Sequence, residues 1–76
     1  METVYVLIVS EMGSEQYVIK KLLMIDEIKE VNQVWGAYDI VVKVVGPTSD
    51  AVREIITGKI RMIEDIKTTV SLIVSR

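Results

Sequence analysis

Hydrophobic residues in the first third of the chain follow a β-strand pattern and then a helical one. Residues 3–10 are rich in β-branched side chains and are apolar at both odd and even positions, so a strand here needs cover on both of its faces. Gly13 breaks the pattern, and Ser14 is a suitable N-cap for a helix. A helical repeat follows at Val18, Ile19, Leu22, Leu23 and Ile25.

The remaining sequence predicts a hairpin, a second helix and a closing strand. Residues 28–35 and 38–45 read as strands, and Gly36-Ala37 is a short connection between them, with the glycine supplying a positive φ. Gly46-Pro47 ends the hairpin, and residues 48–50 offer N-caps for a helix that Gly58 loosens or ends early. This helix carries apolar residues at Val52, Ile55, Ile56, Ile60 and Ile63. Residues 67–75 alternate as a fourth strand, whose more apolar face holds Val70, Leu72 and Val74.

The order of these elements is βαββαβ, which predicts one α+β domain over residues 1–76. Its two halves, residues 3–35 and 38–75, are βαβ units of similar length. Right-handed crossovers interleave such units into a ferredoxin-like fold, a four-stranded antiparallel sheet with both helices on one face. The other face has no helix to cover it, so we expect a second copy to pack there and form a dimeric α/β sandwich.

Length and cysteine content support the same expectation. A chain of 76 residues buries about 60 to 65% of its unfolded surface, so its core alone gives limited stability. The absence of cysteine excludes disulfides and thiolate metal sites, and it fits a reducing cytoplasm. Oligomerisation is the remaining route to stability. The longest apolar run, residues 4–9, is too short to span a bilayer, so we expect no membrane association.

Charge and residue chemistry exclude several classes of function. The formal charge of −2 comes from interspersed signs without a basic patch, so direct nucleic-acid binding is not expected. The chain has neither histidine nor cysteine, which removes the commonest general base and metal ligands. We therefore expect no catalytic residue, no metal and no cofactor. The adjacent carboxylates Asp26-Glu27 and Glu64-Asp65 lie at expected helix ends, where capping and solvation explain them.

The predicted hairpin contains a distinctive motif. Residues 34–44 read VWGAYDIVVKV, in which Gly36 and one variable residue precede Tyr38-Asp39 and an alternating apolar strand. This segment resembles the Gly-x-Tyr-Asp motif of the effector-binding (RAM) domain of the Lrp/AsnC transcriptional regulators. The resemblance extends to the strand before the glycine, residues 31–35, and to the closing strand, residues 66–74, with its alternate hydroxyl-bearing positions. It covers essentially the whole chain.

This resemblance implies an assembly and a ligand, but not promoter binding. Members of the family usually carry an N-terminal helix-turn-helix, whereas Met1 leads directly into the first strand, so the sequence looks like a stand-alone RAM domain. The family implies homodimers joined sheet to sheet, assembled into a ring or disc such as an octamer or decamer. Small effectors, typically amino acids, bind in crevices between the dimers. In one variant of this role, the domain mixes with full-length Lrp/AsnC regulators and alters their assembly.

The hairpin offers the groups that an amino-acid zwitterion requires. Asp39 can accept the ammonium protons, while backbone N–H groups of residues 36–38, together with Thr69 or Ser71, can bind the carboxylate. Gly36 permits close approach, and Trp35 can be an interface anchor or part of a pocket wall. The expected ligand-binding residues are Trp35, Gly36, Ala37, Tyr38, Asp39, Thr69 and Ser71.

Other interpretations of the same residues stay open. Gly36 can simply permit the turn while Asp39 bonds nearby backbone N–H groups, without any ligand. The domain would then be a purely structural oligomerisation module. A small dimeric α/β-barrel enzyme has the same topology, and the missing histidine argues against it.

Overall fold

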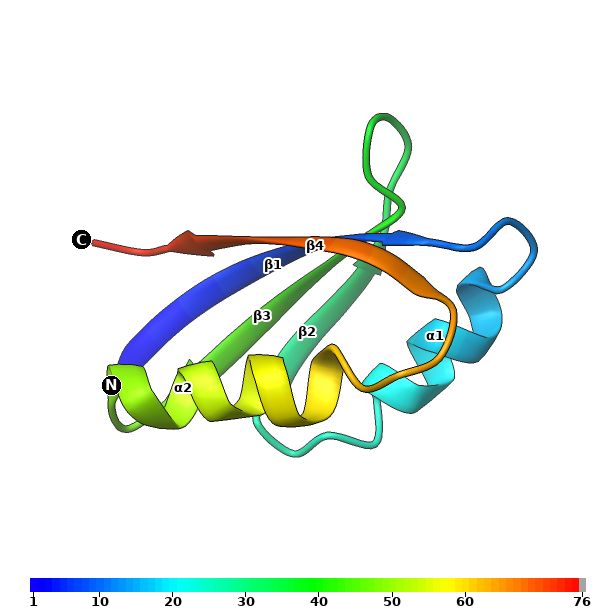
Figure 1. Ribbon diagram of the computed structural model, residues 1–76. Coiled ribbons are helices and arrows are strands. Elements are labelled where there is room, and N and C mark those ends of the chain that lie inside the picture. Colours follow the sequence, from blue (N-terminus) through cyan, green and yellow to red (C-terminus); the bar gives the residue numbers. More distant parts are fainter. Residues whose placement is uncertain (76) are drawn as a thin grey trace.

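The computed structural model describes residues 1–75 and has the βαββαβ order predicted from the sequence. The elements are β1 (Glu2–Ser10), α1 (Glu15–Leu22), β2 (Ile28–Gln33), β3 (Ile40–Gly46), α2 (Ser49–Ile55), the π-helical turn η1 (Ile56–Ile60) and β4 (Ile66–Ile73). The four strands form one antiparallel sheet in the order β2-β3-β1-β4, and both helices lie on one side of it (Figure 1). The predicted ferredoxin-like fold is confirmed. The expected domain reached residue 76, which lies outside the described residues.

The core lies between the sheet and the helices, and strand alternation decides which side chains enter it. From Val4 onward, the even-numbered residues of β1 and β3 are buried, whereas their odd-numbered neighbours are only half-buried. The strands contribute Val4, Val6, Ile8, Ile40, Val42 and Val44, and the helices contribute Val18, Leu22, Val52, Ile55, Ile56 and Ile60. Because these residues recur with the periods of strand and helix, burial follows directly from the sequence pattern.

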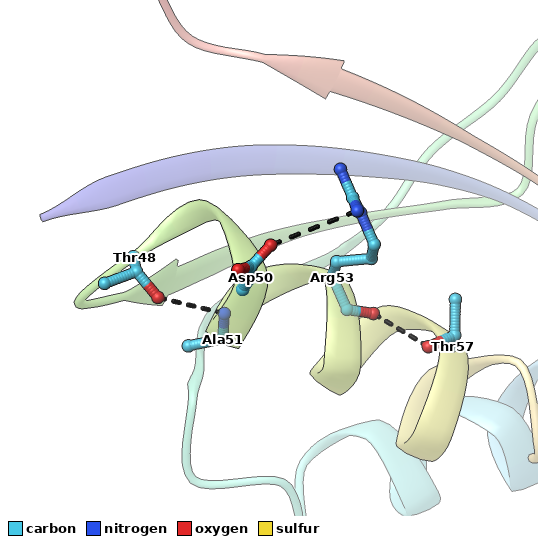
Figure 2. A network of polar contacts seen from close by, with 5 residues as sticks. All are labelled: Thr48, Asp50, Ala51, Arg53 and Thr57. Carbon is cyan, nitrogen blue, oxygen red and sulfur yellow. Dashed lines mark hydrogen bonds and ion pairs between the residues drawn. The ribbon is translucent and has the colours of Figure 1, made fainter.

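The two helices begin in different ways. Thr48 caps α2, since its hydroxyl accepts a hydrogen bond from the backbone N–H of Ala51 at 3.1 Å (Figure 2). Ser14 occupies the N-cap position of α1 as predicted, but its side chain does not cap the helix. Its hydroxyl instead donates to Asp65 at 3.0 Å, across the turn that precedes β4. Asp65 has a φ of 73°, the left-handed conformation that short polar side chains tolerate.

The second helix changes its winding at Ile56. The sequence predicts apolar helical positions as far as Ile63, whereas the regular α-helix ends at Ile55. The following turn, η1, is closed by the backbone N–H of Arg61, which donates to the Ile56 carbonyl oxygen at 2.9 Å. Gly58, expected to loosen this helix, lies within the π turn. The wider turn brings Ile60 into the core together with the two preceding isoleucines.

The sheet face opposite the helices is apolar and is not covered within the described chain. β1, β3 and β4 place on it Tyr5, Leu7, Val9, Val41, Val45, Val70 and Leu72. Lys43 and Glu30 lie on the same face, with Nζ and Oε2 separated by 3.7 Å. We call this surface the open face. Among residues 1–75, no helix is long and apolar enough to cross a membrane.

Candidate functional site

The connection between β2 and β3 is longer than the two-residue turn expected from Gly36-Ala37. The strands end at Gln33 and resume at Ile40, so residues 34–39 form a loop that projects from the end of the sheet (Figure 1). The backbone N–H of Val34 donates to the Asp39 carbonyl oxygen at 2.8 Å and closes the base of the loop. Gly36 has a φ of 131°, a conformation that other residues rarely adopt, so the predicted need for glycine is confirmed.

Asp39 fixes this loop to the end of β1. Its Oδ2 accepts hydrogen bonds from the backbone N–H of Ser10 at 2.9 Å and from the Ser10 hydroxyl at 3.3 Å. Its own N–H donates to the carbonyl oxygen of Ile8 at 2.9 Å. Asp39 therefore makes the backbone contact that the purely structural interpretation requires. Within residues 1–75, Oδ1 of the same carboxylate takes part in no hydrogen bond and can accept one from a ligand.

Trp35 stands in solvent at the tip of the loop, with a relative exposure of 102%. It borders a shallow cavity of about 280 Å³ lined by Glu15, Gln33, Val34, Trp35, Gly36 and Asp39. No hydrogen bond within residues 1–75 uses the backbone N–H groups of Gly36, Ala37 or Tyr38. The loop thus presents unpaired donors, one carboxylate and a large apolar side chain within a single short segment.

The two hydroxyl-bearing residues predicted for this site lie elsewhere in the isolated chain. Thr69 of β4 pairs with Ile8 of β1, close to the base of the loop, but it does not line the cavity. Ser71 lies farther along β4 and lines a different groove, beside α2. One chain therefore brings together only the hairpin half of the predicted set.

Ser10 and Glu15 were missed by reasoning from the sequence. Ser10 is buried and holds Asp39, and Glu15 at the start of α1 forms one side of the cavity. Ser10 did leave a signal, because from Val4 onward it is the one polar residue at the buried parity of β1. Such a residue needs a hydrogen-bond partner.

One carboxylate of each adjacent pair, Glu27 and Asp65, makes a side-chain contact. Glu27 accepts a hydrogen bond from Lys59 at 3.3 Å. A hydrogen bond with its own backbone, followed by the contact with Lys59, lowers the pKa of Glu27 below its usual value. Asp65 accepts from the hydroxyl of Ser14. Across residues 1–75, no three histidine, cysteine or acidic side chains lie close enough together to hold a metal ion.

The fold and the loop define a small α+β domain with unpaired polar groups on a connection at the end of the sheet, a position where ligand-recognition loops are often found. Residues 3–76 match the family model of the Lrp/AsnC ligand-binding domain. The chain belongs to this family. The resemblance seen in the hairpin sequence is thereby confirmed.

Comparisons with solved structures agree with this assignment. FFRP-DM1 is 39% identical, with a TM-score of 0.93, and the match covers 97% of this chain and 99% of that protein. Escherichia coli AsnC is 28% identical, with a TM-score of 0.94, over 99% of this chain and 51% of AsnC, so the chain spans about half of AsnC. A transcriptional regulator from Neisseria meningitidis, solved with L-methionine, has a TM-score of 0.86 over 99% of this chain and 50% of its own, but at 8% identity it shows the fold alone. No curated protein matches the sequence significantly.

Proposed function

We propose that this domain binds a small amino-acid effector at the β2–β3 loop and assembles with its own copies through the open face, without catalysing a reaction or contacting DNA. The observation that carries the proposal is the loop itself, which holds a fully exposed tryptophan beside unpaired backbone donors and Asp39. An exposed tryptophan on a small domain is typical of a surface that a partner or ligand covers.

The chemistry of the loop suits a zwitterion. Backbone N–H groups of residues 36–38 can donate to the ligand carboxylate, and Oδ1 of Asp39 can accept from the ammonium group. Trp35 then supplies an apolar wall for the side chain. L-Methionine in a regulator of the same fold makes amino acids the first ligands to test. Since Thr69 and Ser71 lie away from the cavity, they can contribute only from another copy, in a crevice between dimers.

The open face supplies the surface for assembly. It combines half-buried and exposed apolar side chains of three adjacent strands, a continuous patch of the kind that monomeric proteins rarely leave uncovered. Packing two such faces gives the sheet-to-sheet homodimer, and contacts through the loops can join dimers into an octamer or decamer. Because such a role requires access to transcriptional regulators, we expect the assembly in the cytoplasm.

Trp35 allows a direct test because it is the only tryptophan in the chain. Its fluorescence should shift to shorter wavelength when a ligand or a neighbouring subunit covers it. We would screen the twenty amino acids at millimolar concentration by thermal shift and fluorescence, and measure the mass of each hit by light scattering. A selective shift that Asp39→Asn abolishes, while the variant keeps its oligomeric state, supports effector binding. A stable monomer with no shift would contradict the proposal.

A second candidate function is a purely structural oligomerisation domain, favoured by the bonds between Asp39 and Ser10. In that case the oligomer forms, Trp35 is already covered in it, and no amino acid changes its melting temperature. The domain could then act by joining full-length Lrp/AsnC regulators through the open face. Native mass spectrometry of a mixture with such a regulator would detect mixed oligomers, and substitution of Leu72 by aspartate on the open face should abolish them.

A further inference from the structure

A second hollow of the molecule lies on the helix side of the sheet, between β4 and the segment formed by α2 and η1. This groove has a volume of about 240 Å³. It exists because α2 packs against β1 and β3, which leaves the inner face of the edge strand β4 partly open. Ile73 shows the effect: it is 73% exposed although it pairs with Val4, which is buried on the same face.

One wall of the groove is polar and positively charged. Ser49, Arg53, Thr57 and Arg61 line it together and follow one another at intervals of four residues, so they share one helix face. Figure 2 shows the Arg53 side chain pointing away from the helix, on the side where β1 and β4 run. The π turn η1 forms the second half of this wall, and such turns are frequent at functional sites.

The guanidinium groups on this wall are weakly engaged. Nη1 of Arg53 lies 4.0 Å from Oδ1 of Asp50, and both side chains are largely exposed, so this pair contributes little. Among residues 1–75, no carboxylate lies within 4.0 Å of Arg61. A guanidinium group is suited to hold a carboxylate through two parallel hydrogen bonds.

The floor of the groove is apolar, and one acidic residue borders it. Val4, Val52 and Ile56 form the floor, and Ile73 borders it from β4. Glu2 lies at the same groove and disfavours a second negative charge on a ligand. The volume is below the range of about 300–1,000 Å³ that is usual for drug-sized ligands, so it suits a metabolite-sized molecule.

We propose that this groove binds a small organic monocarboxylate with an aliphatic chain. The carboxylate contacts Arg61 and Arg53, and the chain covers Ile56 and Ile73. Within one chain the groove lies apart from the loop: Val4 lines the groove, whereas the loop is bonded to Ile8, four residues or roughly 13 Å farther along β1. Binding here therefore does not use the residues of the loop, although Ser71, which the proposed effector crevice takes from another copy, also lines this groove.

The test uses 4-methylpentanoate and two control probes. 4-Methyl-1-pentanol keeps the aliphatic chain but lacks the charge, and acetate keeps the charge but lacks the chain. Isoleucine methyl NMR of the intact oligomer follows Ile56 and Ile73. We expect 4-methylpentanoate to shift both signals and each control probe to bind at least about 10-fold more weakly, because one charge-assisted hydrogen bond of about 1.4 kcal/mol corresponds to a factor of ten. Binding should persist in Trp35→Ala, which removes the tip of the loop.

Arg61→Gln should weaken binding of 4-methylpentanoate by about 10-fold. Lys59→Gln is the matched control, because Lys59 lies on the same π turn but pairs with Glu27 outside the groove. It should leave the dissociation constant unchanged. Unshifted Ile56 and Ile73 signals, or equal affinity in Arg61→Gln and the parent, would overturn the proposal. A change of oligomeric mass in Arg61→Gln without any change in the affinity for 4-methylpentanoate would also overturn the proposal, because it would show that a neighbouring subunit occupies the groove.

Discussion

Asp39 gives the sharpest test of how the β2–β3 loop is held. Its Oδ2 accepts from the N–H and the hydroxyl of Ser10, which lies 29 positions away in the sequence. Asp39→Ala removes this acceptor and leaves the buried N–H of Ser10 without a partner. Asp39→Asn keeps an acceptor oxygen in the same place and removes only the charge, while Ser10→Ala removes only the longer of the two bonds.

The magnitude follows from the burial of Ser10, which is 4% exposed. A buried donor that loses its partner costs about 1–3 kcal/mol. For 76 residues the total free energy of unfolding is about 4–11 kcal/mol, so Asp39→Ala removes a substantial share of it. Asp39→Asn retains a neutral hydrogen bond and should lose about 0.5–1.5 kcal/mol. Ser10→Ala should cost less than about 1 kcal/mol, since the hydroxyl bond is long.

Urea denaturation followed by circular dichroism measures these differences, at two or more protein concentrations because assembly adds to the apparent stability. In thermal melts, each kcal/mol corresponds to a fall of about 4–8 °C for a domain of this size. An Asp39→Ala variant as stable as the parent would refute the structural role of this carboxylate. If the predicted order holds, Asp39→Asn is the variant to use in ligand screens, because it retains the loop.

Three further perturbations test the fold. Gly36→Ala should cost about 1–2 kcal/mol in urea denaturation, because residue 36 has a positive φ. At Gly58 an added Cβ also meets no atom within 4 Å, but φ is not positive, so Gly58→Ala should be neutral or stabilising. Equal costs of the two substitutions would contradict this reasoning. Leu22→Ala should lose about 2–5 kcal/mol by leaving a cavity, and a loss as small as that of the exposed Leu23→Ala would show that the core repacks. Glu27→Gln should be less stable than the parent above pH 4.5, because the contacts that lower the folded-state pKa of Glu27 stabilise its charged form. The difference in stability should vanish as pH falls through the folded-state pKa. A difference that stays constant in acid titrations would refute the assignment.

The fold could be predicted because its signals are local and repeated. Strand β1 is apolar at both parities, which indicated a central position with cover on both faces, and the structure places it between β3 and β4. Strand ends were harder to predict. Val34, Trp35 and Tyr38 have high strand propensity, which predicts that they belong to strands. All three lie in the loop, so the predicted connection was too short. Propensity describes a residue's fit to a pleated surface and cannot say where pairing stops.

The candidate site was predictable in composition but not in connectivity. The motif identified Gly36, whose positive φ agrees with its expected role in the connection, and Asp39, whose carboxylate accepts a backbone hydrogen bond as the structural interpretation expected. The bond between Asp39 and Ser10 depends on the register of β1 against β3, which no local pattern contains. The separation of Ser71 from the loop has the same origin, because it follows from the pairing of β4 with β1.

The π turn at Ile56–Ile60 determines which side chains of the following residues face the groove. In a regular α-helix, side chains four residues apart rotate by about 40° around the axis at each step, so a long row drifts away from one surface. A wider turn absorbs an additional residue and corrects this drift, which keeps Arg61 beside the groove while Ile60 stays in the core. Loss of a single residue near Gly58 would therefore change which charges face β4 without shortening the sheet. Relatives that differ by one residue here could share the fold and still recognise different molecules.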